Sequence, residues 1–326
     1  MNNMNTDMQK KVKQDPIIKK WIKNYNANYN SGIFIGDRVK PFAFIQNTRP
    51  YAGKPCVLIV AGPSVDKNIS ILKNFQKNVI ILAADVILYK LLENGIQPDF
   101  VVNIDPSDMF VRFWNDQNTS ELTLMCPTST HPDVLNAWKG RYIFFNQADI
   151  SRSEKGKTLR EITKRTGGFG SIFNKFFIGA TMLQIAKIME LQPAILIGYD
   201  FAYSDGKAYC DGFLERKIYD DLYNPETPEH IKQLKKLKKM EIREEVKTRD
   251  INGKFIQTTK QFQFYKNSFL KLKEALNIPI VNSTEGGILL GVPCMRLQKS
   301  LEKFCLNEIN KKDIFKIPKR KRKRKK

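Results

Sequence analysis

Residues 56–64, CVLIVAGPS, combine a continuous apolar run with an abrupt turn. The run Cys56–Ala61 has the length and the β-branched content of a strand that is buried on both faces, as strands of parallel sheets are. The Gly-Pro-Ser sequence at 62–64 then turns the chain, and Ser64 or Asp66 can cap a following helix. The stretch therefore predicts the first strand and turn of an α/β fold.

The same alternation of apolar runs and helical stretches continues along the chain. Further runs of strand length lie at 79–83, 100–104, 122–126, 142–145, 194–198 and 278–281. Helical stretches lie between them, at 86–94, 132–139, 171–191, 227–246 and 260–276. Strands that alternate with helices are typical of a doubly wound fold. The sequence therefore predicts a Rossmann-like, mostly parallel sheet with helices on both faces.

The positive charge of the chain is concentrated at its C-terminal end. The 326 residues include 55 Lys or Arg and 33 Asp or Glu, which gives a formal net charge of +22. Residues 311–326 hold eleven of the basic residues and one acidic residue. Such a run is typical of a disordered tail that attracts nucleic acid, anionic lipid or an acidic surface without specificity. We expect an N-terminal helix and extended arm at 1–52, a Rossmann-like domain at 53–305 and a basic disordered tail at 306–326.

The composition excludes several classes of protein. A chain with 42% hydrophobic and 11% aromatic residues has enough apolar surface for a core, which excludes disorder throughout. It has no run of eighteen apolar residues, and its N-terminal residues lack the apolar segment of a signal peptide. Five cysteines without a CxxC spacing and two histidines do not suit a zinc site. We expect a cytoplasmic protein that binds no metal, and the oligomeric state stays open.

Function-capable side chains follow almost every predicted strand. Ligands of open α/β sheets bind outside the carboxyl ends of the strands, so these residues are candidates for a site. They are Gly62, Pro63, Ser64, Asp85, Asn103, Asp105, His131, Tyr199, Asp200, Asn282, Thr284 and Glu285. The turn at 62–64 is either a helix cap or an anion site built from free N–H groups. Asp85 is either a helix cap or an acceptor for a ribose hydroxyl, and Asp200 either caps a turn or acts on a substrate.

The glycine-rich sequence GGFGS at 167–171 precedes a long apolar stretch. We expect Ser171 to open the helix over 171–191, so that Gly170 and the helix N-terminus form a second anion site. The alternative is a flexible loop in which Ser171 serves only as a cap.

Three blocks of the sequence resemble one known family. They are 57–108 (VLIVAGPSVDKNISILKNFQKNVIILAADVILYKLLENGIQPDFVVNIDPSD), 170–209 (GSIFNKFFIGATMLQIAKIMELQPAILIGYDFAYSDGKAY) and 251–292 (INGKFIQTTKQFQFYKNSFLKLKEALNIPIVNSTEGGILLGV). Together they are similar to the motility accessory factors, or flagellin glycosyltransferases, a family also described as 6-hydroxymethylpterin diphosphokinase-like. The resemblance covers about residues 52–305, and it lies in the three blocks together because the Gly-Pro-Ser turn alone is common.

The resemblance implies roles for particular residues. The family looks similar to metal-independent, Rossmann-like bacterial sialyltransferases, which implies that the turn at 62–64 approaches the phosphate of a cytidine-monophosphate (CMP) sugar. By the same resemblance, the other residues near the donor are Gly170, Ser171, Tyr199, Asp200, Asn282, Thr284, Glu285 and Gly286. The sequence departs from the family at Tyr209, where many members have His, and at Tyr199, where Gln is usual.

Three functions are compatible with these features. The first is a glycosyltransferase that moves a nonulosonic, sialic-acid-like sugar from CMP to a hydroxyl of a protein or glycan, with flagellin as one candidate acceptor. Its candidate general bases are Asp200, His131 and Asp105, and it needs no cofactor besides its donor substrate. The second is a 6-hydroxymethylpterin diphosphokinase that uses ATP and Mg²⁺, with Asp105 and Asp108 as metal ligands. The third is a non-catalytic nucleotide-binding protein with a basic interaction tail.

Overall fold

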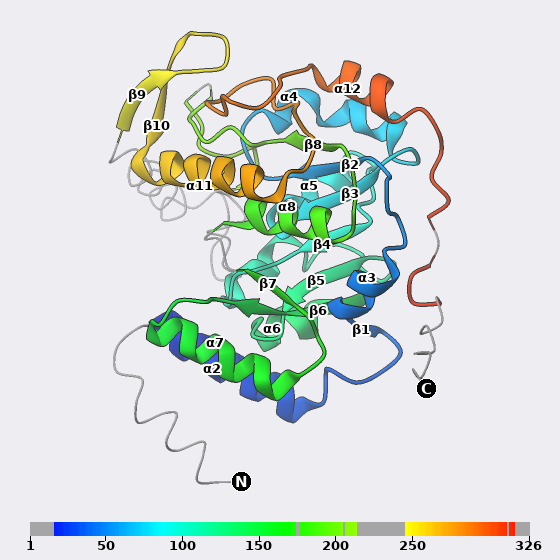
Figure 1. The fold of residues 1–326 in the computed structure, drawn as a ribbon. Coiled ribbons are helices and arrows are strands. Elements are labelled where there is room, and N and C mark those ends of the chain that lie inside the picture. Colours follow the sequence, from blue (N-terminus) through cyan, green and yellow to red (C-terminus); the bar gives the residue numbers. More distant parts are fainter. Residues whose placement is uncertain (1–15, 174–176, 205, 214–244, 312, 317–326) are drawn as a thin grey trace, which may run out of the picture.

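A parallel sheet forms the centre of the molecule (Figure 1). The computed structural model describes residues 16–173, 177–204, 206–213, 245–311 and 313–316. In this part of the chain the sheet has nine strands, in the order β1-β6-β5-β4-β3-β2-β8-β11 with β7 paired to β6. The strands are β1 (Val39–Pro41), β2 (Cys56–Ile59), β3 (Ile80–Ala84), β4 (Phe100–Val102), β5 (Thr123–Pro127), β6 (Arg141–Ala148), β7 (Ser171–Phe173), β8 (Ala194–Ile197) and β11 (Ile280–Asn282). All pairings in this sheet are parallel, which confirms the predicted doubly wound α/β fold.

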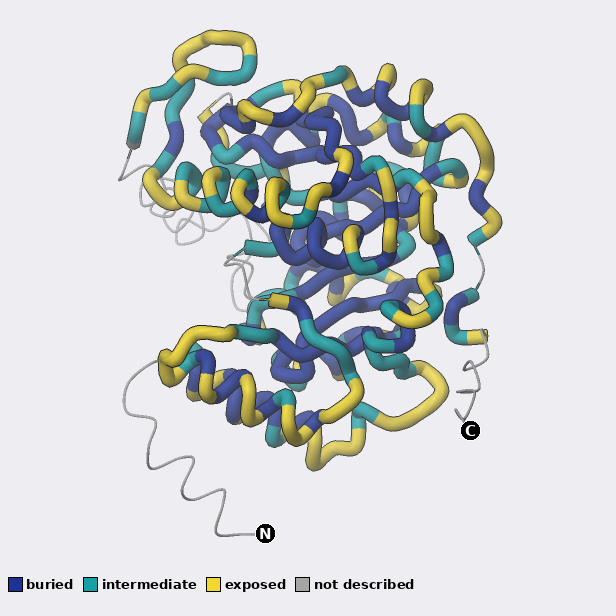
Figure 2. The backbone as a smooth tube through the Cα atoms, viewed as in Figure 1, coloured by how far each residue is buried: buried dark blue, intermediate teal, exposed yellow. Residues whose placement is uncertain are grey.

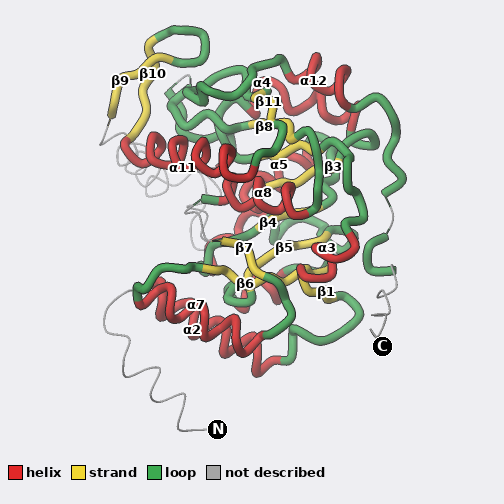
Figure 3. The backbone as a smooth tube through the Cα atoms, in the orientation of Figure 1, coloured by secondary structure: helices red, strands yellow, loops and turns green. Residues whose placement is uncertain are grey.

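Helices surround the sheet (Figure 3). The α-helices are α2 (Pro16–Ser31), α3 (Phe42–Thr48), α4 (Val65–Asn68), α5 (Leu88–Glu93), α6 (Pro132–Ala137), α7 (Glu154–Thr166), α8 (Ile178–Ile188), α11 (Lys260–Leu276) and α12 (Leu297–Phe304). Three 3₁₀ helices are η1 (Ile69–Phe75), η2 (Asp85–Ile87) and η3 (Asp108–Phe113). Helix α8 packs on β2 and β3 with α11 outside it, and α2 pairs with α7 near β6 (Figure 1). No helix in the described residues is long and apolar enough to cross a membrane.

The central strands are buried on both faces (Figure 2). Every residue of β2, β3, β4, β5, β8 and β11 is buried. Strand β2 pairs in register with β3 on one side and β8 on the other, so that Cys56 lies opposite both Ile80 and Ala194. A strand with neighbours on both edges and helices on both faces exposes no side chain to solvent, so apolar residues are favoured along its whole length. This explains the uninterrupted apolar run in 56–61.

The N-terminal segment adds an edge to this sheet. Helix α2 is followed by β1, which pairs with β6, and by the short helix α3. The side chains of Asn24 and Asn28 on α2 donate hydrogen bonds to the carbonyl oxygen of Pro106, which follows β4, and to those of Thr128–Thr130, which follow β5. The segment expected as a helix and an extended arm therefore holds a helix, an edge strand and a second helix in its described residues.

The expected helix over 171–191 is wrong at its start. Residues Ser171–Phe173 form β7, and Ser171 pairs with Asn146 of β6. The helix begins only at Ile178, after Phe177 as its N-cap. The short sequence SIF is compatible with a strand as well as with the start of a helix, and its pairing with β6 makes it a strand. The other long helical prediction, over 227–246, lies outside the described residues except for its last two positions, which belong to a strand.

A two-stranded hairpin was not predicted. Its strands β9 (Glu245–Arg249) and β10 (Phe255–Thr259) are antiparallel and project beside α11 (Figure 1). Hydrogen bonds attach it to the loops that follow β8 and β11: Tyr203 N–H donates to Gln257 O (2.8 Å), Ile251 N–H to Gly287 O (2.9 Å) and Thr258 Oγ1 to Phe201 O (2.6 Å). The Asn-Gly pair at 252–253 between two β-rich runs is a strong hairpin signal that could have identified it.

The prediction of a disordered tail over 306–326 is wrong for its described residues, 306–311 and 313–316. Ile309 and Ile314 are buried in the main core, with 8% and 5% of their surface exposed. Lys311 pairs with Asp99 at 2.7 Å, and Asp313 pairs with Arg141 at 2.7 Å. The composition of this segment did not indicate that it packs on the domain, because its two buried isoleucines lie within a basic stretch.

We expect Ile314→Ala to lower the free energy of unfolding by about 2 kcal/mol or more, because it removes buried methyl groups and leaves a cavity. Leu306→Ala is the matched control in the same segment, since Leu306 is 73% exposed and its loss should change stability by less than about 0.5 kcal/mol. Chemical denaturation measures both. Equal small effects would show that the segment does not pack on the domain in solution.

Candidate active site

The order of the sheet reverses between β2 and β8. From β2 the chain adds β3, β4, β5 and β6 on one side, and later places β8 and β11 on the other. Such a reversal opens a crevice beyond the carboxyl ends of the strands. A cavity of about 260 Å³ lies at this place, lined by residues that follow β2, β3, β4 and β8. It is the candidate active site.

The cavity combines aromatic rings with carboxyl groups. The aromatic residues in its wall are Phe110, Phe177, Tyr199, Phe201, Tyr209, Phe213, Phe262 and Tyr265. Its ionisable acids are Asp85, Asp105 and Asp200, and no Lys or Arg among the described residues lines it. The aromatic residues come from five separate segments, most of them outside the strands, so strand ends alone did not predict them. The site therefore offers apolar faces and hydrogen-bond acceptors to a ligand.

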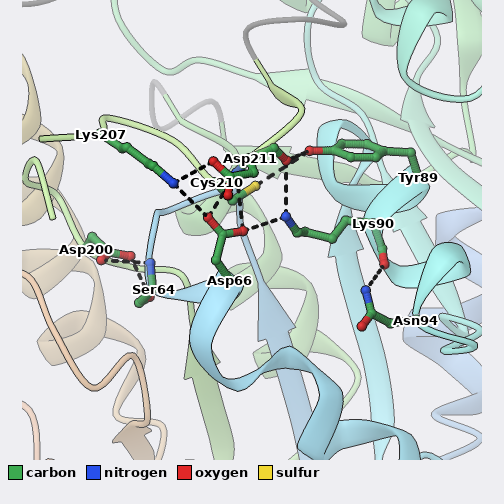
Figure 4. A network of polar contacts seen from close by, with 9 residues as sticks. All are labelled: Ser64, Asp66, Tyr89, Lys90, Asn94, Asp200, Lys207, Cys210 and Asp211. Carbon is green, nitrogen blue, oxygen red and sulfur yellow. Dashed lines mark hydrogen bonds and ion pairs between the residues drawn. The ribbon is translucent and has the colours of Figure 1, made fainter. Parts of the chain in front are cut away.

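Asp200 ties together the two turns that flank the reversal (Figure 4). Its Oδ2 accepts from the hydroxyl of Ser64 (2.7 Å), and its Oδ1 accepts from the N–H of Ser64 (3.2 Å) and the hydroxyl of Ser204 (3.0 Å). The residue is 1% exposed. Burial raises the pKa of Asp200 to about 6, although the hydrogen bonds from Ser64 and Ser204 lower it. Asp200 thus connects the two turns that form the site, and it also lines the cavity.

The turn at 62–64 does not present free N–H groups. The N–H of Ser64 donates to Asp200, that of Val65 to Gly62 O (3.2 Å) and that of Asp66 to Pro63 O (3.2 Å). The helix that follows, α4, has only four residues. Pro63 and Ser64 are buried. In this structure the turn therefore has the geometry of a packed connection, and the expected anion site at its N–H groups is not formed.

Asp85 and Asn103, which follow neighbouring strands, form a buried pair. Asn103 Nδ2 donates to Asp85 Oδ2 (2.6 Å), and the N–H of Val86 donates to Asp85 Oδ1 (2.8 Å). Burial raises the pKa of Asp85 to about 7, with hydrogen bonds opposing the shift and the nearby Asp105 adding to it. Both residues lie at the ends of predicted strands, and Asn103 does not line the cavity. Asp85 reaches the cavity, where it can accept a hydrogen bond from a ligand.

The pKa of Asp85 predicts how Asp85→Asn responds to pH. A carboxyl whose folded pKa lies above its unfolded value contributes stability at low pH that is lost as pH rises through the folded pKa. The free energy of unfolding of the variant should therefore rise relative to wild type, by about 2 kcal/mol between about pH 5 and pH 7. Denaturant titrations at several pH values measure the difference.

Asp149→Asn is the control for this comparison. Asp149 is partly exposed and its pKa is lowered, chiefly by the hydrogen bond from the Ser151 N–H, so it titrates below this pH range. Its stability curve should run parallel to that of wild type between about pH 5 and pH 7. If the difference in the free energy of unfolding between Asp85→Asn and wild type were also independent of pH, Asp85 would be ionised with an ordinary pKa.

Asp105 is the accessible carboxyl of the cavity. It is partly exposed, lines the cavity and accepts one hydrogen bond, from the Ser107 N–H to Oδ1 (2.8 Å). Burial raises the pKa of Asp105. Asp108 begins η3 on the exposed side and does not line the cavity. The two carboxyls proposed from sequence as a metal pair therefore have different surroundings.

His131 has a structural role in this structure. Its Nδ1 accepts from the N–H of Asp133 (3.2 Å), which makes it the N-cap of α6. It does not line the cavity. The carbonyl oxygens of the preceding residues Thr128–Thr130 are covered by Asn24 and Asn28 of α2. The geometry thus offers no direct route from His131 to a ligand in the cavity.

Four residues at or after the ends of β8 and β11 were expected near the donor, and most of them form hydrogen bonds within the loops instead. Tyr199 lines the cavity, while its hydroxyl donates to Gly179 O (3.2 Å) and its N–H donates to Thr284 Oγ1 (3.2 Å). Asn282 Oδ1 accepts from the N–H of Thr284 (3.1 Å). Glu285 Oε1 accepts from the N–H of Leu297 at the start of α12 (2.9 Å). The structure therefore brings only Tyr199 of these four to the cavity.

Gly170 and Ser171 lie outside the cavity. Gly170 has a φ of +80°, and a Cβ there would lie 2.5 Å from the side chain of Gln46 and 2.8 Å from the backbone N of Ala43. Any larger residue at position 170 would therefore collide with α3. Because Ser171 starts a strand and not a helix, the expected second anion site is wrong.

The segment 206–213 closes one side of the cavity. The N–H of Cys210 donates to Ala61 O (3.0 Å), next to the turn after β2. Tyr209 and Phe213 line the cavity with their rings stacked, 4.0 Å between centroids. Tyr209 therefore lies in the site.

A charged network holds this segment in place (Figure 4). Lys90 on α5 pairs with Asp66 on α4 at 2.5 Å, and the Asp66 carboxylate accepts from the Asp211 N–H at 3.0 and 3.2 Å. Lys207 pairs with Asp211 at 2.6 Å, and the Tyr89 hydroxyl donates to the Asp211 carbonyl. The wall of the cavity is thus fixed to the two helices beneath it.

The described residues contain no group of three His, Cys, Asp or Glu side chains close enough to hold a metal ion. In ATP-dependent enzymes Mg²⁺ is usually held by one or two carboxylates together with the phosphates of the substrate. Of the two carboxyls predicted as its ligands only Asp105 lines the cavity, so we derive no step through a metal.

Comparisons with known proteins identify the family. A family model described as 6-hydroxymethylpterin diphosphokinase MptE-like matches residues 20–206, which is more than half of the chain. The chain belongs to this family. The match spans most of α2, the strands β1 to β8 and the turns that follow β2, β3, β4 and β8 at the cavity, so the MptE-like region includes most of the candidate site. No curated protein matches the chain in sequence.

A solved structure shares the fold of this MptE-like chain. The Maf glycosyltransferase from Magnetospirillum magneticum AMB-1 superposes with a TM-score of 0.56 at 13% sequence identity. The similarity covers 89% of this chain and 40% of the Maf chain, so this MptE-like chain spans less than half of the larger protein's length. The comparison agrees with the resemblance to motility accessory factors in the sequence, and at this identity it establishes the fold alone.

Proposed function

We propose that this protein is a glycosyltransferase that moves a nonulosonic, sialic-acid-like sugar from a CMP-activated donor to a hydroxyl of a protein or glycan, with flagellin as one candidate acceptor. The observation that carries the proposal is the cavity at the reversal of the sheet, with aromatic walls and three carboxyl groups. Aromatic faces suit a nucleobase or the C–H face of a sugar, and carboxylates accept hydrogen bonds from its hydroxyls. The fold shared with a Maf glycosyltransferase supports the same function.

Asp105 is the general base that the geometry favours among the three candidates. Transfer requires that an acceptor hydroxyl lose its proton as its oxygen attacks the anomeric carbon and CMP leaves. Asp105 is partly exposed in the cavity, whereas His131 caps a helix outside it. The oxygens of Asp200 already accept three hydrogen bonds. In this proposal Asp200 is a positioning residue, and its negative charge also stabilises an oxocarbenium-like transition state.

The diphosphokinase function is the second candidate, because the family description names it. The cavity offers a pterin ring the same aromatic and carboxyl groups that it offers cytosine. Its described wall has no Lys or Arg, so the single phosphate of CMP suits the cavity better than the more highly charged triphosphate of ATP, and this favours the sugar transferase.

Thermal-shift measurements with CMP, ATP and 6-hydroxymethylpterin test the proposal. A ligand at a hundred times its dissociation constant adds about 2.7 kcal/mol to stability, which raises the melting temperature measurably. CMP should stabilise the protein, and should do so less in a Phe213→Ala variant that loses part of the aromatic wall. Stabilisation by the pterin and ATP but not by CMP would favour the second candidate.

A further inference from the structure

A polar groove of about 760 Å³ lies beside the aromatic cavity. It is bounded by α4, the β9–β10 hairpin and the loops that follow β8 and β11. The groove and the cavity share no lining residue in the described parts of the chain. Their chemistry also differs, since the groove is lined by Lys67, Lys247 and Lys254, whereas the cavity wall has no described basic residue.

The acidic residues of the groove are already engaged by backbone N–H groups. Asp250 Oδ1 accepts from the N–H groups of Asn252 (2.9 Å) and Lys254 (2.8 Å), and thereby closes the hairpin turn. Glu285 Oε1 accepts from the N–H of Leu297. No ion pair within the described residues involves Lys247 or Lys254, and both lysines are exposed. The ammonium groups of Lys247 and Lys254 are therefore accessible to a ligand in this groove.

The loop after β11 adds backbone donors. Gly286 and Gly287 line the groove, and their N–H groups donate no hydrogen bond to another described residue. Neither residue has a side chain to keep a ligand away from the backbone. A Cβ at Gly286 would meet only the Ser204 hydroxyl at 3.7 Å and Asp200 Oδ1 at 3.8 Å. Backbone N–H groups beside lysines are a common arrangement for binding phosphate oxygens.

The wall between the groove and the cavity contains Asp200. Ser204, a groove residue, donates to Asp200 Oδ1 at 3.0 Å, and Asp200 itself lines the cavity. Asp200 is buried and is also bound to Ser64 on the far side. Asp200 and its hydrogen-bond partners therefore separate the groove from the cavity.

We propose that the groove is a second binding site, for a phosphate-bearing ligand that binds separately from the ligand of the aromatic cavity. Lys247 on β9, Lys254 at the hairpin turn and the N–H groups of Gly286 and Gly287 contact the phosphate oxygens. The site stands on these residues and does not depend on the sugar transfer proposed for the cavity.

Calorimetry with inorganic pyrophosphate tests the site on the full chain. The double variant Lys247→Gln/Lys254→Gln should bind pyrophosphate roughly tenfold more weakly or worse, because it removes two charge-assisted hydrogen bonds. Lys271→Gln is the matched control: Lys271 is an exposed lysine of α11 that does not line the groove, and its loss should leave the affinity unchanged. Higher salt should weaken binding to the wild type.

A cavity variant separates the groove from the cavity. Asp105→Asn removes a negative charge from the cavity and should leave pyrophosphate affinity as it is in wild type. Failure of pyrophosphate to bind, an equal loss in the lysine double variant and the Lys271→Gln control, or a strong gain in Asp105→Asn would each overturn the proposal. The last result would place the anion in the aromatic cavity.

Discussion

The Asp105→Asn variant is expected to turn over a CMP-activated nonulosonic acid about a hundredfold more slowly than wild type, the usual scale for loss of a general base. The amide keeps the shape of the side chain and the hydrogen bond from the Ser107 N–H, but it cannot accept a proton from the acceptor hydroxyl. Because Asp105 is partly exposed, the substitution should leave the melting temperature and the affinity for CMP near their wild-type values.

Asp108→Asn is the matched control, since Asp108 lies three residues further on and does not line the cavity. Its turnover should stay within about twofold of wild type, as expected for a residue without a role in the reaction. The rate of CMP release under saturating donor measures both variants. Equal losses in the two would point to a shared metal-binding role, and loss in neither would remove Asp105 from the chemistry.

A second large effect is expected on stability, from Gly62→Ala. A Cβ at residue 62 would lie 2.1 Å from the carbonyl oxygen of Gly198 and 2.1 Å from Asp200 Oδ2. The turns after β2 and β8 would have to separate, which would also break the hydrogen bonds between Ser64 and Asp200. We expect the free energy of unfolding to fall by about 3 kcal/mol or more, because both neighbours are held by the sheet.

Gly286→Ala is the control for this substitution, because its Cβ approaches the same carboxylate at an ordinary 3.8 Å. It should change stability by less than about 0.5 kcal/mol. Urea unfolding of the two variants measures the difference. If Gly62→Ala were as stable as wild type, the close approach of the two turns would not exist in solution, and the turn would be free to receive a ligand.

The sheet could be predicted because its strands are buried on both faces. Each central strand appears in the sequence as an apolar run, and the reported strands β2, β3, β5 and β8 begin within one or two residues of these runs. The edge strand β1 and the hairpin strands were missed because edge and exposed strands keep polar residues. Strand β10, for example, has Phe255 exposed and only Thr258 fully buried.

The strand ends predicted part of the site. Asp85 follows β3, Asn103 and Asp105 follow β4, and Asp200 follows β8. Parallel strands place their carboxyl ends at one edge of the sheet, and three of these four residues line the cavity together. The roles of Ser64 and Gly62 could not be derived in the same way. Both residues pack against the turn after β8, which lies more than a hundred residues away in the chain, and no local pattern encodes that contact.

Helix starts were the least reliable signal. Ser171 after a glycine-rich stretch has the sequence of a helix N-cap, yet pairing with β6 makes it a strand residue. His131, by contrast, follows a strand as a catalytic residue would, and its imidazole caps α6. Capping and catalysis use the same polar residue types at the same strand ends, so only the three-dimensional contacts separate them.

Release of CMP from a CMP-activated nonulosonic acid, measured in the presence of a metal chelator, tests the central claim most directly. The glycosyltransferase account predicts that wild type releases CMP and transfers the sugar to an added hydroxyl acceptor, and that the Asp105→Asn variant does so about a hundredfold more slowly. Absence of CMP release, together with Mg²⁺-dependent conversion of ATP to AMP when 6-hydroxymethylpterin is supplied, would contradict it.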